Sequence, residues 1–424
     1  MNNPPHILVV STSDASGGAA RAAYRIHRAV QSLGTECWML VKNKITTDSS
    51  ILLLSDYTPT NSVYRIYDWI RNKIKNKIQH FCWKRYPNRE DVFMSDLRSV
   101  PLHGALQQLD FDVLHLHWIN LRFLDIKELK KTKKPIVWTL HDCWAFTGIC
   151  HYFYTCERYK STCGNCPFLH SGKENDLSAA VWKQKQKIYD GLDLHIVTPS
   201  NWLAQAARES ALFGRFPVTV IPNPIDKGYF TPGSRQMAYE LLQLNPDKKY
   251  ILFGAMNAVR DKNKGFNEFL AAIRYFEDIS DYSDVELIIF GANEELGELN
   301  IRLKVHNPGI LHDEQLIAAY RAASIMVVPS LSENLSNIIM ESLSCGTPVA
   351  AFRIGGNSDM IDHRQNGYLA EPFNPEDLTA GIAWCLDNNA NGELSRNART
   401  KVEANYSMER VGEKYVELYK ELIK

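Results

Sequence analysis

Two glutamates, Glu333 and Glu341, lie eight positions apart in the segment PSLSENLSNIIMESLSCGTPV, on either side of a predicted helix start near Ser336. Acidic residues on a helix usually pair with a lysine or arginine one turn away, and this segment contains neither. The amides and positive dipole end of a helix start favour a phosphate or diphosphate. Eight helical residues span about 12 Å, so each acid could accept hydrogen bonds from a sugar at one end of a diphosphate. The alternative for Glu341 is a solvated helix face.

These acids need a scaffold, and the sequence predicts an α/β fold. Apolar, β-branched runs alternate with helical patterns, which is typical of a doubly wound parallel sheet. The predicted strands are residues 6–12, 36–42, 112–118, 135–142 and 194–200, then 250–255, 285–291, 324–330, 348–354 and 367–372. Residues 220–234, rich in proline and glycine, predict a hinge between the two series. We expect two Rossmann-like domains facing a central cleft, residues 1–222 and 223–406, with residues 407–424 crossing back onto the first.

Several motifs along the chain resemble those of one enzyme family. The two acids are preceded by DEQLIAAYRAASIMVVPS and followed by GTPV, and the other shared motifs are SGGAARAAYRIHRAV, WTLHDCW, VTPSNWL, VIPNPID and IGGNSDMIDHRQNGYLAEPFNPEDL. Together they make the chain similar to the retaining nucleotide-sugar glycosyltransferases of family 4, of the bacterial capsular and exopolysaccharide type. The resemblance covers nearly the whole chain. It implies the GT-B fold, with an N-terminal acceptor-binding domain and a C-terminal nucleotide-sugar-binding domain.

The resemblance assigns roles to the residues around the two acids. Glu333 would contact hydroxyls of the donor sugar, and Glu341 would hold the ribose. The donor diphosphate would be held by the backbone amides of Asn334, Leu335, Ser336 and Asn337.

The resemblance also implies cationic side chains that neutralise the leaving diphosphate. Lys264, followed by glycine, matches the family's lysine. The arginine departs from the family spacing, because Arg260 stands only four positions before the lysine, and either Arg260 or Lys262 takes its place. The alternative for Lys264 and Arg260 is an exposed loop charge. Asp359 occupies a position where the family carries glutamate, and we expect it to be structural.

In the first domain, the resemblance places a glycine-rich loop and a histidine near the reacting groups. Gly17 and Gly18 would let the backbone approach the donor phosphates. Arg21 would contact a phosphate or the acceptor, the alternative being an exposed helix residue. His141 would lie near the reacting carbon, the alternative being a core histidine. Asp142 would orient the imidazole or bind acceptor hydroxyls.

The implied reaction is a retaining transfer from a nucleotide-diphosphate sugar to a saccharide or lipid-linked saccharide. No side chain is an obvious nucleophile, so catalysis by His141, Glu333 and Lys264 would stabilise the departing charge without a required cofactor. His115 and His117 alternate on one strand face, and we expect them to be structural or on the acceptor side. The alternatives are another GT-B reaction, such as a sugar-nucleotide epimerase or phosphorylase, or a non-catalytic sugar-nucleotide-binding protein.

Four cysteines cluster in CHYFYTCERYKSTCGNCP, namely Cys150, Cys156, Cys163 and Cys166. Four thiolates with a Cys-x2-Cys end suit tetrahedral zinc. We expect a structural zinc, because four protein ligands leave no position for water. The alternatives are free structural thiols and disulfides.

Residues 62–87 are basic and aromatic, with isoleucine at every fourth position from Ile66 to Ile78. Such a helix can lie on an anionic membrane, which would suit a lipid-linked acceptor at the inner face of the plasma membrane. The alternative is a helix that packs on its own domain with a solvated basic face.

The composition is that of an ordinary soluble protein: 424 residues, 45% hydrophobic and 23% charged. The net charge of +0 gives no global field for nucleic acid. The first residues lack the basic region of a signal peptide, and no window approaches the roughly 20 apolar residues of a membrane span. We therefore expect a cytoplasmic or peripheral protein.

Overall fold

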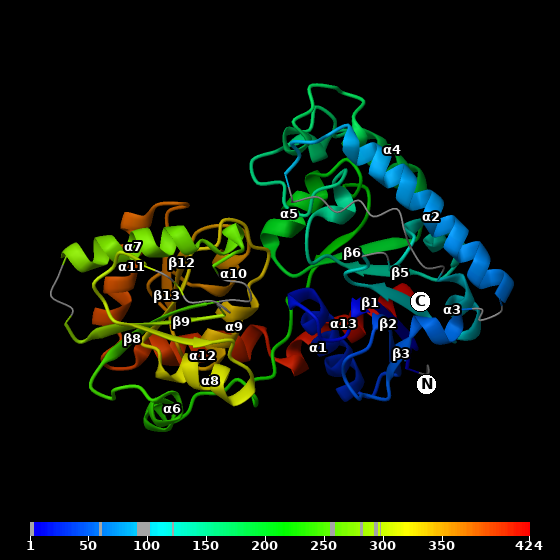
Figure 1. Cartoon of the computed structure of the whole chain (residues 1–424). Helices are drawn as coiled ribbons and strands as arrows, with labels where there is room; N and C mark the ends of the chain where they lie inside the picture. Colours follow the sequence, from blue (N-terminus) through cyan, green and yellow to red (C-terminus); the bar gives the residue numbers. More distant parts are fainter. Residues whose placement is uncertain are drawn as a thin grey trace. The chain divides into compact units, whose positions relative to one another are not determined.

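The chain forms two compact units in the computed structural model, Met1–Pro224 with Val411–Lys424 and Ile225–Arg410. The structure describes residues 4–58, 62–90, 102–120, 123–254, 259–279, 283–291, 296 and 298–424. In each unit, helices cover both faces of a parallel sheet (Figure 1). The predicted fold class, two doubly wound α/β domains, is therefore confirmed.

The sheet of the first unit has seven parallel strands in the order β3-β2-β1-β4-β5-β6-β7. They are β1 (Ile7–Ser13), β2 (Cys37–Asn43), β3 (Ile51–Leu53), β4 (Val113–Leu116), β5 (Ile136–Thr139), β6 (Leu194–Thr198) and β7 (Val218–Val220). In β1, Ile7 lies opposite both Cys37 and Val113. The central strands are apolar along their whole length because helices cover both of their faces.

Two groups of helices cover this sheet. One face packs against α1 (Gly18–Ser32) and α13 (Met408–Leu422), and the other against α3 (His103–Gln108), α4 (Leu177–Tyr189) and α5 (Asn201–Glu209). A further helix, α2 (Ser62–Lys84), is the longest of the described elements. Short 3-10 turns occur at Leu54–Tyr57, Ile126–Lys131, Trp144–Phe146, Arg158–Lys160 and Pro167–Leu169.

The second unit repeats this topology with six parallel strands in the order β10-β9-β8-β11-β12-β13. They are β8 (Lys249–Gly254), β9 (Val285–Phe290), β10 (Val305–Gly309), β11 (Ile325–Val328), β12 (Val349–Phe352) and β13 (Gly367–Ala370). One face is covered by α6 (Arg235–Leu242), α8 (Asp313–Ala322), α9 (Asn337–Ser344) and α12 (Glu393–Asn405), and the other by α7 (Phe266–Ile279) and α11 (Pro375–Asn388). The unit also contains α10 (Asn357–Met360) and a 3-10 turn at Lys262–Lys264.

Every predicted strand is present, but the sequence did not reveal β3, β7 and β10. All three lie at sheet edges, and two of them are only three residues long. An edge strand pairs on one side only and is less buried, so its sequence carries a weaker apolar signal. Within the described residues, no helix is both long enough and apolar enough to span a membrane.

Candidate functional site

Both sheets reverse their strand order beside the first strand, at β1/β4 in one unit and β8/β11 in the other. In doubly wound sheets, ligands bind beyond the carboxyl ends of the strands at this switch point. The loops after β8 and β11 are therefore where the second unit should bind a ligand. In the first unit, the loops after β1, β4 and β5 are the corresponding places for ligand binding.

Hydrogen bonds fasten the loop after β8 to the loop after β11. The Asn263 carbonyl oxygen accepts from the Leu331 amide at 2.9 Å. The Asn263 side-chain amide donates to the carbonyl oxygen of Ser332 at 2.7 Å. Asn263 is buried, so it sets the relative position of the two loops. No pattern in the sequence indicated this role.

This fastening brings Lys264 and Glu333 together. The Lys264 Nζ atom lies 3.5 Å from Glu333 Oε2, and the side chains remain 25% and 15% exposed. The Glu333 carboxylate raises the pKa of Lys264, which opposes the effect of burial. The pair therefore presents a permanent cation beside a carboxylate just before α9.

Two glycines allow the backbone to approach closely here. Gly265 has φ +71° and Gly355 has φ +50°, both in the left-handed region. A Cβ atom at Gly265 would overlap the carbonyl oxygen of Pro329, and one at Gly355 would overlap that of Glu333. Gly265 and Gly355 therefore both pack closely against the backbone before α9, and these contacts fix the position of Glu333.

Helix α9 begins as predicted, with Ser336 at the N-cap and Asn337 as the first helical residue. The Ser336 side chain makes no capping hydrogen bond. The first amides of an α-helix have no acceptor inside the helix, so this end can bind an anion. Asn334 and Leu335, which precede the cap, are buried.

Glu341 lies on the buried side of α9 and is only 2% exposed. Its Oε2 atom accepts a hydrogen bond of 3.1 Å from the hydroxyl of Tyr320, on α8. The alternative interpretation of Glu341, as a residue on a solvated helix face, is therefore wrong. Its role in ribose binding stays a prediction. Tyr320 had no distinguishing signal in the sequence.

Two further charged residues were selected from the sequence of the second unit, Arg260 and Asp359. Arg260 is exposed in the turn before Lys262–Lys264. Asp359 lies on α10, where its backbone carbonyl oxygen accepts from the Tyr406 hydroxyl at 2.6 Å. A phosphate contact by Arg260 stays a prediction.

In the first unit, His141 follows β5 and lies against His117 at the end of the neighbouring β4. The Nδ1 atom of His117 is 2.9 Å from Nε2 of His141. Burial lowers the pKa of His141 to about 4, and it lowers the pKa of His117 well below its ordinary value. Both imidazoles are therefore neutral at pH 7. A neutral His141 can donate a hydrogen bond but carries no charge to the substrate.

Asp142 is occupied by donors from its own unit. Its carboxylate accepts from Trp118 Nε1 at 2.7 Å and the Trp144 amide at 2.9 Å, and its Oδ2 lies 2.6 Å from His151 Nδ1. Burial alone would raise the pKa of Asp142, but these partners, above all His151, lower it. The hydrogen-bonded imidazole is thus that of His151, which sequence reasoning had not selected. Acceptor binding by Asp142 stays a prediction.

His115 is part of the core. Its Nδ1 lies 2.7 Å from the Tyr419 hydroxyl and its Nε2 2.8 Å from Thr139 Oγ1. It is fully buried, which confirms the structural interpretation for this histidine.

The glycine-rich loop after β1 leads directly into α1. Gly17 is the N-cap residue with φ 91°, a conformation that favours glycine, and open space surrounds the place where a Cβ would lie. Gly18 is the first helical residue, and Arg21 is half-buried one turn later. The loop thus offers an accessible helix start.

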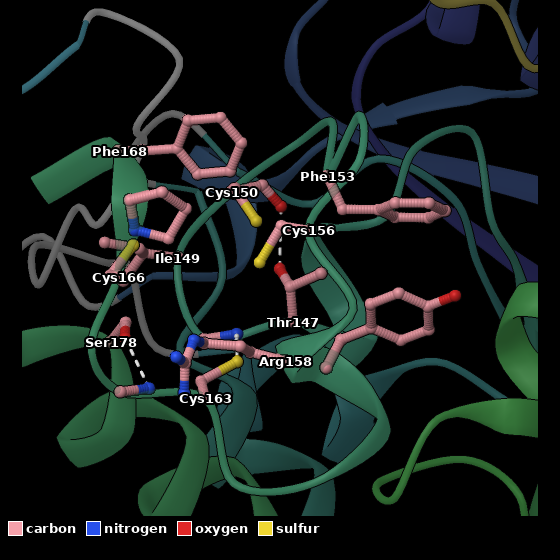
Figure 2. Close-up of a pocket in the computed structure, with 14 residues that line it drawn as sticks. Thr147, Ile149, Cys150, Phe153, Cys156, Arg158, Cys163, Cys166, Phe168 and Ser178 are labelled. Carbon is pink, nitrogen blue, oxygen red and sulfur yellow. Dashed lines mark hydrogen bonds between the residues drawn. The ribbon is translucent and has the colours of Figure 1, made fainter. Parts of the chain in front are cut away.

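The four clustered cysteines line one small pocket in the first unit (Figure 2). All nine cysteines of the chain are free thiols. Across the described parts of the chain, no three histidine, cysteine, aspartate or glutamate side chains are arranged to hold a metal ion. The zinc assignment therefore stays a prediction.

Two family models together match most of the chain. Residues 16–228 match the model described as Glycosyltransferase Family 4, and residues 241–403 match Glycosyl transferases group 1.

Individual proteins show the same likeness. The chain is 25% identical over 341 residues to D-inositol 3-phosphate glycosyltransferase of Paenarthrobacter aurescens, covering 77% of this chain and 76% of the relative. It is 27% identical over 358 residues to the putative colanic acid biosynthesis glycosyl transferase WcaC of Escherichia coli, covering 77% and 79%. Anabaena Alr3699/HepE, solved in complex with UDP and glucose, superposes with a TM-score of 0.63 at 14% identity, covering 98% of this chain and 99% of that one.

Proposed function

The chain belongs to glycosyltransferase family 4, and from this we propose that it is a retaining enzyme that transfers a sugar from a nucleoside-diphosphate donor to a saccharide acceptor. The second unit binds the donor and the first binds the acceptor. The likeness to the colanic acid enzyme WcaC supports a role in building a bacterial surface polysaccharide.

One observation carries the proposal: Lys264 and Glu333 meet at the uncapped start of α9. A leaving diphosphate needs positive charge, and a sugar needs hydrogen-bond acceptors. Lys264 and the α9 amides supply the first, and Glu333 supplies the second. Such fixed dipoles and charges stabilise developing charge without reorganising during the reaction.

In the proposed step, the bond between the anomeric carbon and the diphosphate oxygen breaks, and its electron pair leaves with the diphosphate. The acceptor hydroxyl oxygen bonds to the same face of that carbon. Its proton passes to the departing phosphate oxygen. Lys264 stabilises the negative charge, and neutral His141 donates a hydrogen bond to the donor sugar.

Helix α2 supports a lipid-linked acceptor, because its apolar side faces outward. Seven large side chains are 45–61% exposed: Ile66, Tyr67, Trp69, Ile70, Ile74, Ile78 and Phe81. The opposite side is polar and half-buried, and Lys75 on that side lies 3.5 Å from Asp125. Exposed Lys73, Lys77 and Lys84 lie on this same outward side, each three positions after an exposed apolar residue (Ile70, Ile74 and Phe81). A face that carries both apolar and basic side chains fits an anionic membrane surface.

The function is tested with a panel of UDP- and GDP-sugars and lipid-linked saccharides, measuring release of nucleoside diphosphate and the anomeric configuration of the product. We expect release that depends on the acceptor, with the donor's configuration retained. An inverted product would contradict the retaining mechanism. Activity that needs inorganic phosphate, or an isomerised sugar formed without acceptor, would assign a phosphorylase or an epimerase instead.

Membrane contact is tested by co-sedimentation with vesicles of phosphatidylglycerol and phosphatidylethanolamine. The wild type should sediment with them, and the double variant Ile70→Asp, Ile74→Asp should not. Ile279→Asp, at an equally exposed isoleucine on α7, is the control and should sediment. Equal sedimentation of all three proteins would contradict the role of α2.

A further inference from the structure

Four sulfur-bearing side chains surround a small cavity in the loop between β5 and α4. Cys150, Cys156, Cys163 and Cys166 line it, together with Ile149, Phe153 and Phe168 among others (Figure 2). The cavity has a volume of about 20 Å³, enough for one ion. Sulfur atoms and apolar side chains make up much of its lining, so it offers a soft, sulfur-rich site.

The turn that carries Cys163 and Cys166 has an unusual backbone. Cys163, Gly164 and Asn165 have φ values of 56°, 87° and 42° in succession. A left-handed conformation is unfavourable for most residues other than glycine. A Cβ at Gly164 would overlap the carbonyl oxygen of Glu174. The backbone conformation of this turn is therefore energetically unfavourable. It places the thiols of Cys163 and Cys166 in the lining of the same cavity.

The surrounding chain holds this turn in place. The Cys166 amide donates to Asp176 Oδ2 at 2.9 Å, and the Gly164 amide donates to Ser178 Oγ at 2.9 Å. An amide also reaches a sulfur directly, since Gly148 N lies 3.3 Å from Cys163 Sγ. Hydrogen bonds of this kind around a ligand orient it and favour its anionic form.

A buried cation stands beside the cluster. Lys185 on α4 is 1% exposed, and its ammonium donates to the carbonyl oxygens of Trp144 and Thr147. It lies 3.8 Å from the centre of the Trp144 ring. Within the described residues no carboxylate lies in ion-pair contact with it, although the buried Asp142 carboxylate acts on it at longer range. A buried charge is stabilised by nearby negative charge, and thiolates at Cys150 and Cys163 would add to what Asp142 supplies.

We propose that Cys150, Cys156, Cys163 and Cys166 close around one zinc ion to form a structural site with four thiolate ligands. Four thiolates and Zn²⁺ carry a net charge of −2, which Lys185 partly balances. In such a site each sulfur lies about 2.3 Å from the metal, so binding draws the four side chains inward across the cavity. With four protein ligands, the metal has no open position for catalysis.

A zinc ion at this site would stabilise two neighbouring features of the first unit, the His151–Asp142 contact and the end of α2. His151, next to Cys150, is the partner of Asp142. Trp83 near the end of α2, and Tyr86 just after it, pack against the apolar cluster that includes Cys150 and Cys166. The metal would thus fix both the acceptor-side hydrogen bonds and the attachment of α2.

The experiment measures metal content by mass spectrometry and counts thiols in the denatured, chelated protein. We expect one zinc per chain and nine thiols in the wild type. Cys163→Ser should lose the zinc, whereas Cys82→Ser, at a half-buried cysteine outside the cluster, should keep it. Fewer than nine thiols would show disulfides and overturn the proposal. Nine thiols without zinc, or iron in place of zinc, would also overturn it.

If Cys163→Ser does not fold, a second measurement on the wild-type protein still tests the proposal. Wild-type protein is stripped of metal with a mercurial and a chelator, and cobalt is then added. Tetrahedral thiolate ligation should give intense visible absorption and restore the melting temperature. Absence of both changes would contradict the four-thiolate site.

Discussion

At the scale of single residues, the candidate site contains an ion pair, Lys264 and Glu333, that contributes little to the free energy of unfolding. An ion pair that remains partly exposed, as Lys264 and Glu333 do, contributes roughly 0–1 kcal/mol to folding. The proposed role of the pair, beside the start of α9, is to stabilise charge that develops in the transition state. The loss of Lys264 should therefore appear in the rate and not in the stability.

We predict that Lys264→Ala lowers kcat by about 10²–10³-fold, the usual cost of removing one preorganised electrostatic contact. Its melting temperature should remain within a few degrees of the wild type. The control is Lys249→Ala, which removes an exposed ion pair with Asp284 and should leave kcat unchanged. An equal kcat in both variants would remove Lys264 from the mechanism.

The buried histidines predict a pH dependence of stability. Burial lowers the pKa of His115 to about 3 and that of His141 to about 4, whereas a histidine in an unfolded chain titrates near 6.5. Below pH 6.5 the unfolded state therefore binds more protons, and the free energy of unfolding falls by up to about 1.4 kcal/mol per pH unit for each histidine.

Urea unfolding at pH 7.5, 6.0 and 5.0 measures this slope, in a range where carboxylates are still ionised. His115→Gln should have a shallower slope than the wild type. His170→Gln, at an exposed position, should keep the wild-type slope. A wild-type stability that is flat between pH 7.5 and 5.0 would show that the core histidines are not buried in the neutral form.

At the scale of elements, the candidate donor site consists of three loops that contact one another. The loop after β8 carries Lys264, the loop after β11 carries Glu333, and the turn after β12 brings Gly355 under Glu333. The sequence showed the strands and the start of α9, because their apolar and turn signals are local. It did not show Tyr320, Asn263 or the His117–His141 contact, because these depend on which strands become neighbours.

We predict that Gly355→Ala destabilises the protein by several kcal/mol and lowers donor affinity. The added Cβ would overlap the Glu333 carbonyl oxygen; overpacking costs roughly 1–3 kcal/mol, and the left-handed backbone adds about 1–2 kcal/mol. Gly309→Ala has a similar φ of +74° but open space around the new Cβ, so it should show only the second cost. Equal unfolding free energies for the two variants would contradict the packing described here.

At the scale of the whole molecule, the end of the chain completes the first unit. Helix α13 places Val411, Tyr415, Leu418 and Tyr419 in the core beneath the first sheet. The hydroxyl of Tyr419 lies 2.7 Å from His115 and that of Tyr415 lies 3.0 Å from Thr139. Burial of four such side chains contributes about 6–12 kcal/mol, which is comparable with the whole stability of a typical domain.

Deletion of residues 411–424 should therefore unfold the first unit. The expected result is loss of soluble protein, or of the cooperative melting transition that belongs to that unit. Deletion of residues 423–424 alone, which removes none of the four core side chains, is the control and should melt as the wild type does. A truncated chain with unchanged melting would show that α13 is dispensable.

The central claim is that the second unit holds a nucleoside diphosphate with its ribose at Glu341 and its phosphates at the start of α9. Titration calorimetry of UDP and GDP into the wild type and into Glu341→Gln tests it most directly. One nucleotide should bind the wild type, and the variant should bind it about 10–100-fold more weakly, since a hydrogen bond to a charged group contributes about 1.5–3 kcal/mol. Equal affinity in the two proteins, with the variant folded, would contradict the claim.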